Sequence, residues 1–267
     1  MIGAIFGDII GSRFEFRNIL TKKFPLISES NRFTDDSVMT VAVMKALMDS
    51  KDDFSDLSEQ AVKSMHEVGR HYPYCGYGAT FHKWMWDDNA HPYDSYGNGS
   101  AMRISPVGFA ARDIDEAKTL SAAVTKISHN HPEGMKGAEA TAVAIVMARQ
   151  GKSKDEIEEV MNVYYDLSTT VDEYRAMSFG HGQEICQVTM PQALACFFEG
   201  KNYIDVIRNC ISIGGDSDTI AAIAGGIADA FFGVPKWADR YAKSVLSDEL
   251  KGICNKFELW LESRKAA

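Results

Sequence analysis

Apolar residues recur at intervals of three and four positions along this chain, and that spacing limits what the chain can fold into. It brings apolar side chains to one face of an α-helix, whereas a half-buried strand needs strict alternation. Such alternation, rich in β-branched residues, is nearly absent over any useful length. The sequence therefore predicts an all-α fold. The helical interval is seen at Val38, Val41, Ala42 and Ala46; at Ala140, Val143, Ala144 and Met147; at Leu194, Ala195 and Phe198; and at Ile220, Ile223, Ala224, Ile227 and Ala228.

The composition is that of one globular domain. Hydrophobic residues make up 45% and charged residues 24% of the sequence, which is enough to bury a sizeable core. No Pro/Gly/Ser-rich or low-complexity stretch marks a boundary, and 267 residues are compatible with a single core. We therefore expect residues 1–267 to fold as one domain and to be monomeric.

Charge and cysteine content predict a cytoplasmic protein that binds neither nucleic acid nor membranes. The formal net charge is −9, and no cluster of Lys and Arg is available to neutralise a phosphate backbone. The five cysteines are odd in number and widely spaced, which favours reduced thiols. The N-terminus lacks a signal-peptide pattern, and no apolar stretch is long enough to span a bilayer. An acidic protein that handles a phosphorylated small molecule must offset charge repulsion with metal ions or backbone N–H groups.

Two acidic motifs stand immediately before apolar helical segments, near opposite ends of the chain. Thr34-Asp35-Asp36-Ser37 precedes Val38, and Gly214-Gly215-Asp216-Ser217-Asp218-Thr219 precedes Ile220. Helix capping explains either motif by itself, because Thr, Asp and Ser are preferred N-caps and carboxylates favourably oppose the helix dipole. Capping does not require two carboxylates and a hydroxyl in each motif, in near-mirror order.

Four carboxylates brought together by these motifs would repel one another unless cations neutralised them. Oxygen ligands of this kind suit Mg²⁺ or Mn²⁺, or Ca²⁺, and disfavour zinc, which prefers His and Cys. The motifs therefore predict a site for two divalent cations. The six candidate ligands are Thr34, Asp35, Asp36, Asp216, Asp218 and Thr219.

The N-terminal segment carries glycines four positions apart, at Gly3, Gly7 and Gly11. This spacing places small residues on one helical face, which lets another helix pack closely. In the simplest interpretation the acids of the segment, Asp8 and Glu15, are solvated. Alternatively, Glu15 emerges at the end of the helix as an acid or base beside the metal ions. The spacing alone does not distinguish the two.

Three irregular stretches, at residues 71–80, 87–108 and 128–134, are rich in Gly, Pro, Asp, Asn and His. Loops carried on a helical scaffold are where binding and catalytic residues usually lie. The segment 71–95 is also unusually aromatic. Its rings either shape a substrate pocket or belong to the core.

Two glycine-rich motifs lie in these stretches, Gly76-Tyr77-Gly78 and Ser95-Tyr96-Gly97-Asn98-Gly99-Ser100. Both are explained as turns, since Asn-Gly is a strong turn dipeptide. Both also suit loops whose backbone N–H groups hold phosphate while a ring stacks on a base or sugar. The nearby pair His129 and His131, in a Pro-containing loop, is a weak pattern for a transition-metal site.

Taken in order, five features resemble the ADP-ribosylglycohydrolase family over nearly the whole chain. They are Gly-Asp-x-x-Gly-Ser-x-x-Glu at 7–15, Thr34-Asp35-Asp36-Ser37, Gly-Asn-Gly-Ser-Ala-Met-Arg at 97–103, His-Pro-Glu at 131–133, and Gly215-Asp216-Ser217-Asp218-Thr219. Each is moderately specific, and the ordered set is far more so. The resemblance implies a compact orthogonal bundle of helices with a dinuclear metal cleft.

The resemblance also implies hydrolysis of the N- or O-glycosidic bond that joins ADP-ribose to an acceptor, with two Mg²⁺ or Mn²⁺ ions as cofactors and ADP-ribose as product. By position, the six candidate ligands match the family's metal ligands, and Glu15 matches a glutamate that is catalytic in the serine-directed members. An ADP-ribosylated protein or a small ADP-ribosyl adduct would be the substrate. Arginine-linked ADP-ribose is favoured over serine-linked, O-acetyl, nucleic-acid and small guanidine adducts. The positions where related enzymes contact ADP-ribose are Gly76, Gly78, Ser95, Tyr96, Gly97 and His129.

Two alternative functions stay open. Four Asp and two metal ions also suit hydrolysis of a phosphoester in a nucleotide. A non-catalytic member that only binds ADP-ribose would keep the same fold. The presence of all six candidate ligands and of Glu15 favours an active enzyme.

Overall fold

The structure is a computed structural model that describes residues 2–177 and 184–266. This part of the chain forms α-helices and no strand, so the predicted all-α fold is confirmed; a single isolated bridge pairs Gly97 with Ile185. The helices are α1 (Ile2–Gly11), α2 (Asp35–Asp49), α3 (Leu57–His71), α4 (Ala79–Trp86), α5 (Gly99–Met102), α6 (Ser105–Ala110), α7 (Ile114–Thr125), α8 (Pro132–Arg149), α9 (Lys154–Tyr164), α10 (Val171–Met177), α11 (Cys186–Glu199), α12 (Tyr203–Ser212), α13 (Ser217–Phe232), α14 (Lys236–Val245) and α15 (Asp248–Ala266).

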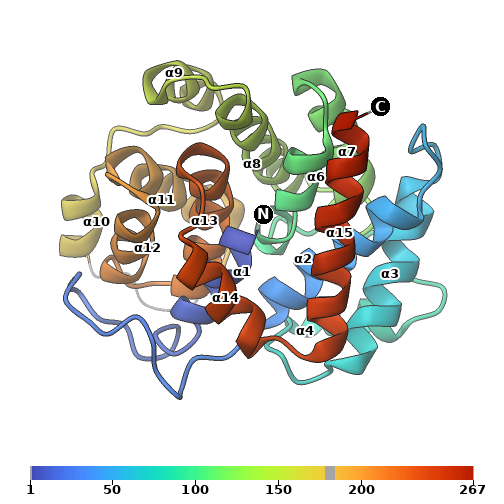
Figure 1. Cartoon of the computed structure of the whole chain (residues 1–267), viewed down its shortest axis with the longest axis horizontal. Coiled ribbons are helices and arrows are strands. Elements are labelled where there is room, and N and C mark those ends of the chain that lie inside the picture. Colours follow the sequence, from blue (N-terminus) through green and yellow to red (C-terminus); the bar gives the residue numbers. More distant parts are fainter. Residues whose placement is uncertain (1, 178–183, 267) are drawn as a thin grey trace.

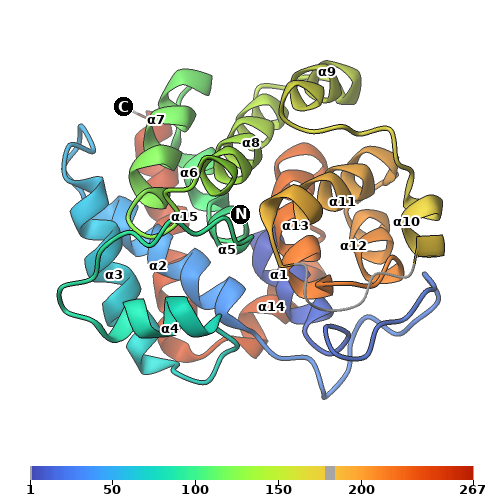
Figure 2. The same cartoon turned by 180° about the vertical axis from the view of Figure 1, so that it is seen from behind.

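The helices are arranged around α1 and α13, which pack against each other. Helices α10, α11 and α12 lie on one side of this pair, and α2, α3, α4 and α15 lie on the other (Figures 1 and 2). Every residue of α13 from Ser217 to Ala228 is buried, because α1, α8, α11 and α12 all pack against it. None of the described helices is both long and apolar enough to cross a membrane.

The glycines of α1 face α13 so closely that no side chain would fit between the helices. A Cβ atom at Gly7 would lie 2.0 Å from the carbonyl oxygen of Ala221, and one at Gly11 would lie 2.4 Å from Cα of Asp218. At Gly3 the carbonyl oxygen of Gly225 would be 2.5 Å away. The predicted close packing is therefore confirmed. Because successive glycines of α1 meet α13 in reverse order, the end of α1 lies beside the start of α13.

The predicted irregular stretches are too long. Helix α5 lies within 87–108, α6 begins at Ser105 inside that stretch, and α8 begins at Pro132, inside 128–134. The short helices escaped prediction because four to six residues cannot display a helical repeat. Pro106 and Pro132 are tolerated in the first turns of α6 and α8, since the N–H that proline lacks has no partner within the helix there.

Candidate metal centre and cleft

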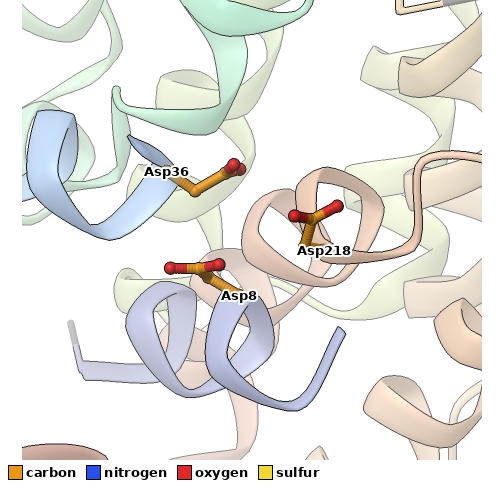
Figure 3. Close-up of side chains that lie close together, drawn as sticks. All are labelled: Asp8, Asp36 and Asp218. Atoms are coloured by element: carbon orange, nitrogen blue, oxygen red, sulfur yellow. The ribbon is translucent and has the colours of Figure 1, made fainter. Parts of the chain in front are cut away.

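Three carboxylates from three helices converge beside the α1–α13 contact. They belong to Asp8 in α1, Asp36 at the start of α2 and Asp218 at the start of α13 (Figure 3). All three side chains are buried, and each offers an oxygen within 4.8 Å of the others. The two acidic motifs therefore do meet, as the sequence analysis required of a metal site.

A second group of acids shares Asp218 with the first. Oxygens of Glu15, Asp216 and Asp218 also lie within 4.8 Å of one another. Glu15 and Asp216 are half-buried, whereas Asp218 is buried between the two groups. This geometry offers two adjacent positions for cations, with Asp218 between them.

The interpretation that Asp8 is solvated is wrong, because its side chain has no exposed surface. Its carboxylate accepts hydrogen bonds from the backbone N–H groups of Thr34 (3.0 Å) and Ser37 (3.1 Å). It also accepts from the hydroxyls of Thr34 (2.7 Å) and Ser37. Asp8 thus holds the N-terminus of α2 against α1. Its place as the sole charged residue in the otherwise apolar segment Ile2–Gly11 was the sequence signal for this role.

Helix capping explains part of the acidic motif at residues 34–37 and little of the motif at residues 214–219. Thr34 caps α2, because its hydroxyl accepts a hydrogen bond from the backbone N–H of Asp36 (3.3 Å). At α13 the N-cap residue Asp216 makes no side-chain capping bond. Its carboxylate instead accepts a hydrogen bond from the side-chain amide of Asn98 (2.6 Å). Asp216 is therefore available to the cleft.

A glycine turn places Asp216 in this position. Gly214 and Gly215 have φ angles of +77° and +70°, a conformation that L side chains rarely adopt. The side-chain amide of Asn18 bonds both polar groups of Gly215, donating to its carbonyl (2.9 Å) and accepting from its N–H (3.1 Å). The turn is therefore held from the loop that follows α1.

The surroundings of these acids favour the binding of divalent cations, because the carboxylates repel one another. Asp36 Oδ1 and Asp218 Oδ1 are buried and have no hydrogen-bond partner, although such oxygens are normally paired. Burial raises the pKa of Asp8 to about 6. Burial, followed by the repulsion of neighbouring carboxylates, raises the pKa values of Asp36 and Asp218 well above the ordinary range. A hard cation would supply the missing partner and remove the repulsion.

Asp35 and Glu15 lie at the margin of this cluster. The backbone N–H of Asp35 donates to the carbonyl of Cys75 (2.8 Å), which ties the loop before α4 to the start of α2. Gly76, with φ +109°, lies against the Asp35 carboxylate, since a Cβ atom there would be 3.0 Å from Asp35 Oδ1. Burial, and then the charge of Asp216, raises the pKa of Glu15 to about 7.

The acids open onto a cleft of about 680 Å³, the size of a typical small-molecule site. Of the thirteen residues predicted to bind metal, act in catalysis or contact ADP-ribose, Thr34 alone does not line it; the hydroxyl of Thr34 contacts Asp8 (2.7 Å) and Asp36 (3.2 Å). The others that line the cleft are Glu15, Asp35, Asp36, Gly76, Gly78, Ser95, Tyr96, Gly97, His129, Asp216, Asp218 and Thr219.

Three further residues of the lining had no predicted role at the site, although two of them lie within motifs described above. Asn98, Arg103 and Glu184 also line the cleft, and the backbone N–H of Asn98 donates to the carbonyl of Glu184 (3.1 Å). The aromatic segment serves both purposes considered for it. Phe81 lines the cleft, whereas Trp84 is buried in the core.

Comparison with known proteins agrees with this architecture. The sequence profile of the ADP-ribosylglycohydrolase family matches residues 1–266. ADP-ribosylhydrolase ARH3 of Gallus gallus is 24% identical, with 89% of this chain and 86% of that protein covered. ADP-ribosylarginine hydrolase Tri1 of Pseudomonas putida is 23% identical, with 91% of this chain and 73% of that protein covered.

A solved structure shows the same fold. It is described as an ADP-ribosylglycohydrolase-related protein complex and matches with a TM-score of 0.68 at 19% identity. The match covers 94% of this chain and 93% of the other. Since the family profile spans almost the entire sequence, this chain belongs to the ADP-ribosylglycohydrolase family.

Proposed function

We propose that this protein is a divalent-cation-dependent hydrolase that cleaves the glycosidic bond between ADP-ribose and an acceptor. The observation that carries the proposal is the pair of acidic groups that share Asp218 at the wall of a nucleotide-sized cleft. Family membership supports ADP-ribose as the ligand, and the relatives named above are ADP-ribosylhydrolases.

Two Mg²⁺ or Mn²⁺ ions bound at the acidic groups would supply the positive charge that fixes the ribose hydroxyls for reaction. Asp8, Asp36 and Asp218 would hold one, and Glu15, Asp216 and Asp218 border the position of the other. The hydroxyl of Thr219 lies against Asp36 (3.4 Å). Thr34, Asp35 and Thr219 complete the set of ligands that the sequence suggested.

In this proposal Glu15 activates the water. Its carboxylate accepts a proton from the attacking water as the water oxygen bonds to the anomeric carbon. The bond from that carbon to the acceptor breaks, and the acceptor leaves with the electron pair and takes a proton from solvent. The negative charge of the neighbouring acids stabilises the oxocarbenium-like transition state.

The glycine-rich loops are proposed to hold ADP-ribose. Gly97 and Gly78 line the cleft, and neither has a side chain that would cover the backbone there. The backbone pairing of residues 96–98 with 184–186 holds the first loop in place. Gly76, Ser95, Tyr96 and His129 line the same cavity.

Arginine-linked ADP-ribose is the substrate we favour, because the cleft suits a cationic acceptor. Its described lining includes seven acidic residues, and Arg103 is the one Lys or Arg among them. Glu184 and Asp94 belong to neither acidic group and add negative charge that would attract a guanidinium group. The relative Tri1 is named for action on ADP-ribosylarginine.

The test is a panel of arginine-linked, serine-linked and O-acetyl ADP-ribose incubated with Mg²⁺, Mn²⁺ or EDTA. We expect the protein to release ADP-ribose, fastest from the arginine adduct. EDTA should abolish this release. Inorganic phosphate or AMP as product would instead identify a phosphoester hydrolase. Tight binding of ADP-ribose with no product from any adduct would identify a non-catalytic member.

The variant Glu15→Gln distinguishes whether Glu15 acts as the base or as a metal ligand. If Glu15 is the base, the variant loses turnover by about 10²-fold or more but keeps its stabilisation by Mg²⁺. Glu29→Gln is the matched control, since Glu29 is exposed in the loop that follows α1. Full turnover by Glu15→Gln would refute the catalytic role, and loss of Mg²⁺ stabilisation would make Glu15 a ligand.

A further inference from the structure

Arg103 is a fully buried cation at the cleft, and no carboxylate among the described residues pairs with it. Its Nη2 donates to the hydroxyl of Ser128 (2.8 Å) and lies 3.5 Å from His129 Nδ1, while its Nε has no partner. The guanidinium lies over the ring of Phe81, 5.3 Å from its centre. Burying a charge without a counter-charge is costly, so this arrangement calls for a functional explanation.

The three polar groups form a chain whose direction is set by Arg103. A guanidinium can only donate, so Ser128 Oγ is the acceptor in its bond with Arg103. The hydroxyl hydrogen of Ser128 then remains to donate to His129 Nδ1, 2.9 Å away. A proton on Nδ1 would point toward the N–H groups of Arg103. Nδ1 is therefore the bare nitrogen, and the ring proton belongs on Nε2.

The Nε2 atom faces the glycine-rich loop of the cleft. A Cβ atom at Gly99 would lie 3.2 Å from it, and one at Gly97 would lie 3.7 Å from it. The ring itself is buried, with Tyr93 and Phe81 at ring-centre distances of 5.8 and 6.2 Å. Burial and the charge of Arg103 hold the pKa of His129 well below its ordinary value.

We propose that Arg103 and Ser128 hold His129 as the neutral Nε2–H tautomer, so that His129 gives the cleft a fixed hydrogen-bond donor beside Gly97 and Gly99. Arg103 is then a positioning residue, and His129 is a donor to a phosphate or ribose oxygen of the ligand rather than an acid that protonates the leaving group. The identity of that ligand rests on the proposed function; the tautomer does not.

The experiment is ¹⁵N NMR of the histidine rings in the full-length protein with excess Mg²⁺ and no nucleotide, with His129→Gln used to assign the signal. Wild type and Arg103→Lys are expected to show a bare Nδ1 and a protonated Nε2, because Lys also only donates. Arg103→Met is expected to show a mixture of tautomers. Ser128→Ala, a smaller change, should show a partial mixture and serves if Arg103→Met does not fold.

Binding of ADP-ribose, measured by calorimetry, is the second readout. Arg103→Met should bind it about 5- to 10-fold more weakly, the effect of about one hydrogen bond, and Arg103→Lys should restore most of the affinity. Arg149→Met is the matched control, since Arg149 donates to the carbonyls of Gly108 and Ala111 and does not line the cleft. It should leave tautomer and affinity unchanged.

A protonated Nδ1 in the wild type, or a single Nε2–H tautomer in both Arg103→Met and Ser128→Ala, would overturn the proposal. Failure to bind ADP-ribose would count against the proposed function instead, because the tautomer is measured without nucleotide.

Discussion

Replacing Asp36 with Asn tests whether repulsion between the crowded carboxylates destabilises the metal-free protein, and whether bound cations offset that repulsion. An oxygen of Asp36 lies within 4.8 Å of oxygens of Asp8 and Asp218, and Asp36 Oδ1 is buried without a partner. At that separation two ionised carboxylates repel by about 3 kcal/mol at an effective dielectric constant of about 20. The hydroxyl of Thr219, which donates to Asp36, can also accept from an amide. Asn therefore removes the charge with little loss of hydrogen bonding.

We expect Asp36→Asn to raise the melting temperature of the metal-free protein. Partial protonation already relieves some repulsion in the wild type, so the gain should be about 1–3 kcal/mol, or about 3–10 °C for a chain of this size. Mg²⁺ at 100 times its dissociation constant should stabilise the wild type by about 2.7 kcal/mol. The variant, which lacks a proposed ligand, should gain little. The wild type should thus be the less stable protein without Mg²⁺ and should recover most or all of the difference with it.

Differential scanning calorimetry after dialysis against EDTA, with and without added MgCl₂, measures both effects. Asp52→Asn is the control, because Asp52 is exposed and belongs to neither acidic group. A metal-free Asp36→Asn protein that melts below the metal-free wild type would refute the argument from crowding. A variant that gains as much from Mg²⁺ as the wild type would show that Asp36 is not a ligand.

Two further predictions concern helix packing and pH. Gly7→Ala should destabilise the protein by about 3 kcal/mol or more in urea unfolding, because its Cβ would lie 2.0 Å from the backbone of α13. The control Gly252→Ala has open space around the new Cβ and should stabilise the protein by about 0.5–1 kcal/mol. Equal effects of the two substitutions would contradict the close contact. Stabilisation by Mg²⁺ should grow as the pH rises from 6 to 8. The folded-state pKa values of Asp8 (about 6) and Glu15 (about 7) are raised above their unfolded values. The stability that bound protons give the metal-free protein is therefore lost as the pH rises through this range. Stabilisation by Mg²⁺ that does not change with pH would contradict the electrostatics of the acidic groups.

The helices and several of their ends were predictable because they depend on local interactions. Helices α2 and α13 begin at the two acidic motifs, where the change from polar to periodic apolar sequence placed them. The glycines of α1 predicted close packing because an interval of four puts them on one face. Helices α5 and α6 were missed because they are too short for any repeat to show.

The candidate site was predictable only as far as its motifs extend. The acids of the two motifs, Glu15 and the glycine-rich loops were all found in sequence, and all line one cleft. Asn98 was seen as part of a turn, but its bond to Asp216 depends on a segment far away in the chain. Glu184 has no local signal, since it reaches the cleft through backbone pairing with residues 96–98.

The sequence by itself determined that this chain is helical and that carboxylates cluster at the starts of two helices. Tertiary structure decided that Asp8 is buried among them and that Asp218 belongs to both acidic groups. The reason is physical: periodicity and capping act over a few residues, whereas the environment of a carboxylate is set by whichever helices pack around it. Here that is α1 against α13, two segments at opposite ends of the chain that meet closely because glycine has no side chain to keep them apart.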